Sequence, residues 1–81
     1  MPQPGKPPLS EATAEFGRLV RARRHELELS QEGLAAVSDL HWTYVGQVER
    51  GQRNLSLHNI LRLAAVLEVD PADLVSGLSW P

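Results

Sequence analysis

Residues 41–54, HWTYVGQVERGQRN, carry side chains that suit hydrogen bonding to the edges of DNA bases. At about 100° per residue, a helix over this segment has one polar arc and one apolar arc. The apolar arc is expected to pack on the domain, and it holds His41, Tyr44, Val45 and Val48. The polar arc is expected to be exposed, and it holds Trp42, Thr43, Gly46, Gln47 and Arg50. In a major groove Gln can bond adenine twice, Thr can bond a base or touch the thymine methyl, and Arg can hold guanine or phosphate.

Two features separate this arc from an ordinary solvated helix face. Such a face would hold more Glu and Lys. Gly46 costs about 1 kcal/mol in a helix interior, and that cost is understandable if something approaches the backbone closely. Taken alone, such a face is still more often plain surface than a binding site. The neighbouring segments must therefore decide between the two interpretations.

The residues before this segment supply a second helix and a turn. Ser30 is a helix cap, and the helix it opens runs from Gln31 through QEGLAAVS. A tight turn follows around Asp39. A helix, a tight turn and a polar-faced helix make up a helix-turn-helix, the arrangement that places its second helix in the major groove.

Three more helices complete the predicted domain. Ser10 caps the first, in which apolar residues at helical spacing continue to Leu27. Ser56 caps the fourth, whose predicted apolar stripe consists of Leu57, Ile60, Leu61, Ala64 and Leu67. Asp70 and Pro71 open a short fifth helix that ends near Gly77. No segment alternates with period two, so the prediction is an all-α fold, a compact bundle of about five short helices with a central helix-turn-helix.

Length and composition limit the alternatives. The chain has 81 residues, enough for one small domain. Residues 1–9, rich in proline, are expected to be a disordered N-terminal arm, and residues 10–81 to be the domain. There is no cysteine for a disulfide or a thiolate metal site. No apolar run suggests a signal peptide or a membrane span, so a cytoplasmic protein without membrane contact is expected.

Neither catalysis nor a cofactor is predicted. The three histidines, His25, His41 and His58, have no metal-ligand spacing with one another or with carboxylates. No serine has a recognisable base partner. We therefore expect no enzymatic activity, no metal and no cofactor, and we expect the histidines to be cap, surface or packing residues.

Three stretches together carry a family resemblance: LSQE.LA in the second helix, TYVGQVERG.RN in the third, and SL.NILRLAAVLEV in the fourth. The run from about Arg24 to Val69 resembles the Cro and phage-repressor (XRE-type) helix-turn-helix family. The sequence pattern TYVG.VERG.RN.SL is also similar to that of the controller proteins of restriction-modification systems. The resemblance implies a lambda-repressor-like DNA-binding domain. It also implies a sequence-specific transcriptional regulator that binds a palindromic operator as a homodimer, with residues 42–50 in the major groove.

The resemblance assigns roles to individual residues. The base-reading positions hold Trp42, Thr43 and Gln47. Contacts to phosphates are expected from Gln31, Tyr44, Arg50, Arg53 and Asn54. For Gln31 the N-terminal amides of its helix would help to hold the phosphate. An internal ion pair is expected between Arg24 and Glu49.

The charge distribution is compatible with DNA binding, although the net charge of −2 argues weakly against it. Residues 41–62 hold three arginines and one glutamate, whereas the chain from Glu68 onward holds three acids and no base. That acidic end is also apolar. The resemblance implies that the fourth and fifth helices form a dimer contact, with Leu74, Val75, Leu78 and Trp80. A two-fold dimer would place two third helices about 34 Å apart, one turn of DNA.

Three residues depart from the family pattern. Asp39 stands where glycine is usual in the turn, and Asp tolerates a left-handed backbone better than most residues. Gly33 cannot complete a capping box with Ser30, which should weaken the start of the second helix. Trp42 stands where close relatives often carry Arg, so it cannot read guanine through a bidentate fork.

An alternative function therefore stays open. Tryptophan is enriched at the energetic centres of protein interfaces. The same fold could serve as a protein-interaction module, an antitoxin or adaptor, whose main ligand is a partner protein. The chain leaves no room for a separate sensor domain, so no small-molecule effector is expected.

Overall fold

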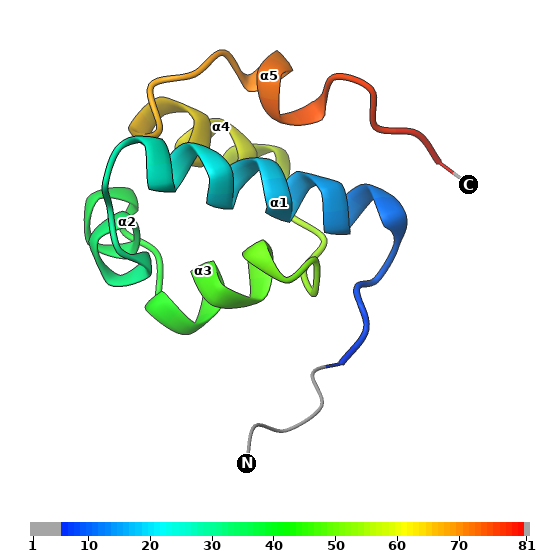
Figure 1. The fold of residues 1–81 in the computed structure, drawn as a ribbon, viewed down its shortest axis with the longest axis horizontal. Helices are drawn as coiled ribbons and strands as arrows, with labels where there is room; N and C mark the ends of the chain where they lie inside the picture. Colours follow the sequence, from blue (N-terminus) through cyan, green and yellow to red (C-terminus); the bar gives the residue numbers. More distant parts are fainter. Residues whose placement is uncertain (1–5, 81) are drawn as a thin grey trace.

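The computed structural model describes residues 6–80, which form five helices joined by short loops (Figure 1). They are α1 (Glu11–Glu26), α2 (Gln31–Ser38), α3 (Trp42–Glu49), α4 (Leu57–Val66) and α5 (Pro71–Val75). The described residues contain no β-strand. The predicted all-α bundle of five short helices is confirmed. Of the predicted disordered arm, residues 1–5 lie outside the described residues, whereas the backbones of Lys6 and Leu9 are hydrogen-bonded to the loop after α3.

Local capping signals set where the helices begin. The four predicted caps, Ser10, Ser30, Ser56 and Asp70, each accept a hydrogen bond from a backbone N–H in the first turn. The fifth cap is His41, whose Nδ1 accepts from the backbone N–H of Thr43 at 3.2 Å. These bonds satisfy N–H groups that have no partner within their own helix.

Asp39 makes the turn of the helix-turn-helix. Its φ of 56° and ψ of 40° place it in the left-handed region, where Asp is among the few non-glycine residues that are tolerated. The backbone N–H of Leu40 then donates to the carbonyl of Ala35 at 3.0 Å. The turn therefore closes the C-terminus of α2 and redirects the chain into α3.

The core is aliphatic apart from one aromatic ring and draws on all five helices. Its buried side chains are Phe16, Val20, Leu34, Ala35, Val45, Val48, Leu63, Ala64, Leu67 and Leu74. Leu74 is only 2% exposed, so the prediction that it makes a dimer contact is wrong. The reason is that α5 packs against α1 and α4, which places Leu74 inside the protomer's own core.

Only part of the predicted apolar stripe of α4 is buried. Leu57 and Leu61 belong to that stripe, but they are 67% and 43% exposed. The inward side of α4 consists of Ile60, Leu63 and Ala64, and Leu67 continues it at the C-cap. Leu57 and Leu61 therefore lie on a neighbouring side of the helix, which remains apolar and uncovered in the protomer.

Gly17 allows α1 and α3 to approach each other closely. A Cβ atom at this position would lie 2.3 Å from the carbonyl oxygen of Val48 and 2.6 Å from that of Glu49. Both atoms belong to the backbone, so no side-chain rotation could relieve the overlap. The absence of a side chain at Gly17 thus sets the distance of α3 from α1.

Candidate nucleic-acid interface

The outer face of α3 carries the polar arc that the sequence predicted. Trp42 is 55% exposed, Thr43 and Arg50 are exposed, and Gln47 is half-buried. Val45 and Val48 on the opposite arc are each 1% exposed. Since α3 packs against α1 and α2 through its apolar side, the polar side faces outward.

The cap of α3 orders the first two residues of this face. The Thr43 hydroxyl oxygen lies 2.7 Å from His41 Nδ1, the same atom that accepts the Thr43 backbone N–H. The indole of Trp42 stacks on the His41 ring, with 6.0 Å between ring centroids. His41 therefore has a role that the sequence did not reveal: it positions two predicted base-reading side chains.

Gly46 is not on the exposed arc, where the sequence placed it. It is buried, and a Cβ there would lie 3.1 Å from the Arg50 guanidinium and 3.5 Å from the Gln31 side-chain oxygen. The group that approaches Gly46 is thus α2, together with the Arg50 side chain. A helical wheel gives the direction of a residue from its own axis, but it does not give the position of a neighbouring helix.

Gln47 and Arg53 are hydrogen-bonded to each other, although separate roles were predicted for them. Arg53 Nε donates to Gln47 Oε1 at 2.8 Å. The Arg53 guanidinium also lies 5.2 Å from the centre of the Tyr44 ring, within cation–π range. Tyr44 in turn accepts a hydrogen bond on its hydroxyl from Asn59 Nδ2 at 3.0 Å. This chain of contacts fixes the amide oxygen of Gln47 and leaves its NH₂ group available to a ligand.

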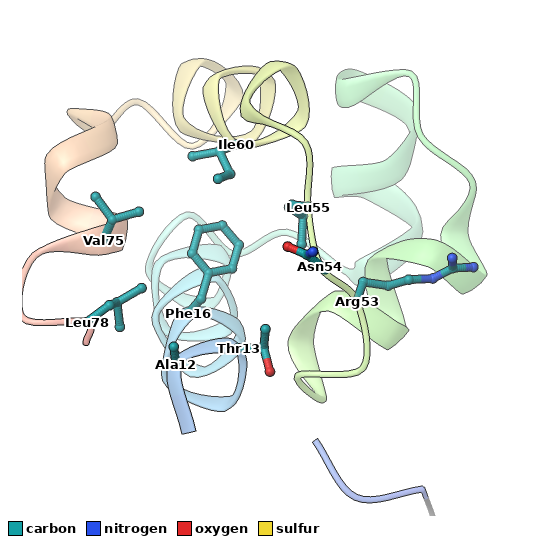
Figure 2. Close-up of a pocket in the computed structure, with 9 residues that line it drawn as sticks. All are labelled: Ala12, Thr13, Phe16, Arg53, Asn54, Leu55, Ile60, Val75 and Leu78. Atoms are coloured by element: carbon teal, nitrogen blue, oxygen red, sulfur yellow. The ribbon is translucent and has the colours of Figure 1, made fainter. Parts of the chain in front are cut away.

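The other predicted phosphate ligands lie at and beyond the end of α3. Arg50 is exposed, and its Nε donates to Gln52 Oε1 at 3.4 Å. Arg53 and Asn54 follow in the exposed loop before α4. Both border an apolar cavity, but the Arg53 side chain extends away from it (Figure 2). The structure therefore places three predicted ligands along one connected stretch, residues 50–54.

A buried ion pair supports α3 from behind. Arg24 Nε and Nη2 donate to the two carboxylate oxygens of Glu49 at 2.6 and 2.9 Å. The two side chains are 8% and 2% exposed. A third Arg24 nitrogen donates to the carbonyl of Leu29 at 2.8 Å. The predicted partners are thus brought together, and the pair joins α1 to α3 and to the chain entering α2.

Gln31 takes part in the same network. Its Nε2 donates to Glu49 Oε1 at 3.0 Å, so the side chain points at the ion pair from the start of α2. The sequence predicted only a phosphate contact for this residue. One of its two amide N–H groups remains for such a contact.

The predicted dimer contact is only partly exposed. Trp80 is 90% exposed and Val75 is 40% exposed, whereas Leu78 is half-buried. Val75 and Leu78 border the cavity of about 160 Å³ that Figure 2 shows between α1, α4 and α5. With the exposed Leu57 and Leu61 of α4, these residues give the protomer several uncovered apolar side chains. The sequence predicted a dimer contact on the fourth helix without naming its residues, and Leu57 and Leu61 are exposed apolar residues of that helix.

Residues 6–80 show neither a metal site nor a membrane-spanning helix. No group of three or more His, Asp or Glu side chains could hold a metal ion in this part of the chain. Over the same residues, no helix has the length and apolar character needed to cross a membrane.

Comparisons with known proteins agree with this geometry. A family model described as helix-turn-helix matches residues 20–74. The control protein C.BamHI of Bacillus amyloliquefaciens is 48% identical over 61 residues, which cover 74% of this chain and 75% of the relative.

Solved structures give the same result. The restriction-modification controller protein C.AhdI from Aeromonas hydrophila is 52% identical, with a TM-score of 0.74 over 76% of this chain and 94% of that chain. SinR, a master regulator for biofilm formation solved in complex with DNA, is 26% identical, with a TM-score of 0.72. That match covers 75% of this chain and 98% of the SinR chain.

Proposed function

Because this chain belongs to the Cro and phage-repressor (XRE-type) helix-turn-helix family, we propose that it is a DNA-binding transcriptional regulator of the restriction-modification controller type. One observation supports the proposal: the outer face of α3 carries exposed hydrogen-bonding side chains, while its inner face packs on the domain. Trp42 and Thr43 are exposed and Gln47 is half-buried, whereas Val45 and Val48 are buried. The relatives are control proteins and transcription regulators, and the assigned role is non-enzymatic.

In the proposed complex α3 lies in the major groove and its side chains read base edges. The amide oxygen of Gln47 is held by Arg53, so its NH₂ group donates to an acceptor such as guanine O6 or N7, adenine N7 or thymine O4. A bidentate contact to adenine also needs the amide oxygen, so Arg53 would have to release it. Thr43 and Trp42 then contact the neighbouring base or sugar.

Phosphate contacts hold α3 in register. Arg50, Arg53 and Asn54 extend from the C-terminal end of α3 toward one backbone strand, and Tyr44 lies beside Arg53. At the other end, Gln31 and the amides at the start of α2 face the second strand, because a helix N-terminus favours an anion. Such contacts position the protein and carry no sequence information.

We further propose a homodimer with two-fold symmetry through α4, α5 and the residues after α5. The support is a set of exposed apolar side chains, Leu57, Leu61, Val75 and Trp80, together with the half-buried Leu78. Such a dimer presents two α3 helices about 34 Å apart, so it matches two half-sites about 10 base pairs apart. A regulator of this kind acts in the cytoplasm, needs no cofactor, and responds to its own concentration.

Two single variants distinguish a base-specific contact by Gln47 from a phosphate contact by Arg53. Gln47→Ala should cost about 1–3 kcal/mol on the best duplex and little on random duplexes, because only a matched base loses its partner. Arg53→Ala should weaken both duplexes and flatten the plot of log affinity against log salt by about 0.9 per protomer. It should also relax the base preference at the Gln47 contact, since it removes the hydrogen bond that holds the amide.

The measurement is a titration of each variant on both duplexes at several salt concentrations. Equal losses for Gln47→Ala on both duplexes would make α3 a backbone clamp. If neither change affected binding, DNA would not be the ligand of this face, and the protein-partner function would take its place.

A further inference from the structure

The segment before α1 is attached to the loop that follows α3. The backbone N–H of Leu9 donates to the carbonyl of Gly51 at 2.8 Å, and Gln52 Nε2 donates to the carbonyl of Lys6 at 2.9 Å. In Figure 1 this segment leaves the start of α1 and runs to the side of the molecule on which α3 lies. Residues 6–9 are thus held at the edge of the candidate DNA interface.

Gly51 makes this attachment possible. Its φ of 74° lies in the left-handed region that favours glycine. A Cβ there would lie 2.7 Å from the Cα of Ala14 and 3.0 Å from the Cβ of Pro8. The turn after α3 therefore fits between α1 and the N-terminal segment and touches both.

Gln52 connects this segment to the DNA-facing end of α3. Its side-chain oxygen accepts from Arg50 Nε at 3.4 Å, and its side-chain nitrogen donates to Lys6. Lys6 is therefore two hydrogen bonds away from Arg50, a proposed phosphate ligand. Both residues are exposed, and Lys6 has no ion pair with another residue in the described part of the chain.

The positive charge of Lys6 suits a contact with a DNA phosphate. Lys6 is the only lysine of a chain whose net charge is −2, and it lies beside the loop that holds Arg53. An ammonium group is a compact point charge with three donors, which suits a phosphate oxygen and reads no base. Holding the backbone of Lys6 in place lowers the ordering cost of such a contact.

We propose that residues 6–9 belong to the DNA interface and that the Lys6 ammonium binds a backbone phosphate next to those bound by Arg50 and Arg53. This inference rests on the proposed DNA-binding function. It makes the N-terminal segment a part of the binding surface, although the sequence predicted a disordered arm.

Salt dependence tests the proposal. Lys6→Gln should flatten the plot of log affinity against log salt by about 0.9 per protomer on specific and random duplexes alike, because one fewer counterion is released. Lys6→Arg should restore the wild-type slope. Arg21→Gln is the matched control, since Arg21 is an exposed cation on α1, a helix assigned to neither the DNA contact nor the dimer contact, and its loss should leave the slope unchanged. The thermal midpoints of all three variants should equal that of the wild type.

Chemical labelling gives an independent measurement. An amine-reactive ester should label the Lys6 side chain rapidly in free protein and at least several-fold more slowly when duplex DNA is bound, as read by peptide mapping. Equal labelling in both states, or a Lys6→Gln slope equal to that of the wild type, would overturn the inference while leaving DNA binding intact. A wild-type protein that binds no duplex would overturn the proposed function itself.

Discussion

The buried ion pair between Arg24 and Glu49 should be the most sensitive polar contact in the domain. Glu49→Ala removes the acceptor of three donors: Arg24 Nε, Arg24 Nη2 and Gln31 Nε2. Arg24 keeps only its bond to the carbonyl of Leu29, and its charge remains buried at 8% side-chain exposure. Breaking such a pair on one side costs about 3–5 kcal/mol. A small domain has about 5–15 kcal/mol in total, so this loss is a large share.

Thermal and urea unfolding followed by far-ultraviolet circular dichroism measure this loss. At about 4–8 °C per kcal/mol, the thermal midpoint of Glu49→Ala should fall by roughly 12 °C or more. Tryptophan fluorescence is a poorer probe, because Trp42 and Trp80 are both exposed in the folded state.

Two controls isolate the cause. Glu15→Ala also removes a carboxylate from an arginine, at an exposed pair, and should hardly move the midpoint. The double variant Arg24→Met with Glu49→Leu removes both charges and keeps an apolar volume, so it should recover most of the stability. If Glu49→Ala moved the midpoint no more than Glu15→Ala, Glu49 would be a surface residue and the support of α3 would be misassigned.

Three further predictions concern packing, titration and assembly. Gly17→Ala should destabilise the domain by about 1–3 kcal/mol or more in urea unfolding, because its Cβ meets backbone atoms. Gly33→Ala should destabilise it far less, because its Cβ meets only the Ser30 hydroxyl at 3.2 Å and a Leu29 methyl at 3.6 Å; equal effects would refute the assigned contact between α1 and α3. The hydrogen bond from Arg18 holds the pKa of Glu15 below its usual range, so the pair's stabilisation is present above the ordinary glutamate pKa and is lost as the pH falls through the lowered one. An NMR titration of Glu15 should find the lowered pKa in the wild type and its loss in Arg18→Gln. If the Glu15 pKa were the same in both proteins, the ion pair would not form in solution. Leu57→Asp should yield monomers in sedimentation at tens of micromolar with an unchanged fold, and a wild type that is already monomeric there would contradict the proposed dimer.

Local signals in the sequence account for most of the fold. Ser30, Ser56 and Asp70 each sit where a helix must begin, and each accepts the backbone hydrogen bond that the capping rule requires. Asp39 occupies the left-handed turn position as expected. These features depend on neighbours within a few residues, so one sequence is enough to predict them.

Features that depend on the packing of distant segments were not predictable in the same way. Gly46 was placed by the geometry of α3 alone, but its surroundings are set by Gln31 of α2. Leu74 belongs to a helix of five residues, too short for a periodic stripe to reveal which side is buried. Leu57 and Leu61 fit a core stripe by spacing, and only the placement of α4 in the bundle leaves them uncovered.

In the candidate site, too, local features were predictable and contacts between distant residues were not. The outward positions of Trp42 and Thr43 came from helix periodicity. Gln47 bonds to Arg53, six positions further along the chain. Gln52 bonds to Lys6, which is separated from it by 46 positions. Nothing in the residue types or their spacing predicted these two contacts.

Selection of bound sites from random duplex DNA tests the central claim most directly. The full chain is incubated with a random pool, bound duplexes are recovered at physiological salt, and the enriched sequences are aligned. The proposed regulator predicts a two-fold symmetric motif with half-sites about 10 base pairs apart, since two α3 helices of a dimer must reach successive major grooves. A pool that shows no enriched motif after repeated rounds, from folded protein at concentrations where it is dimeric, would contradict sequence-specific DNA binding.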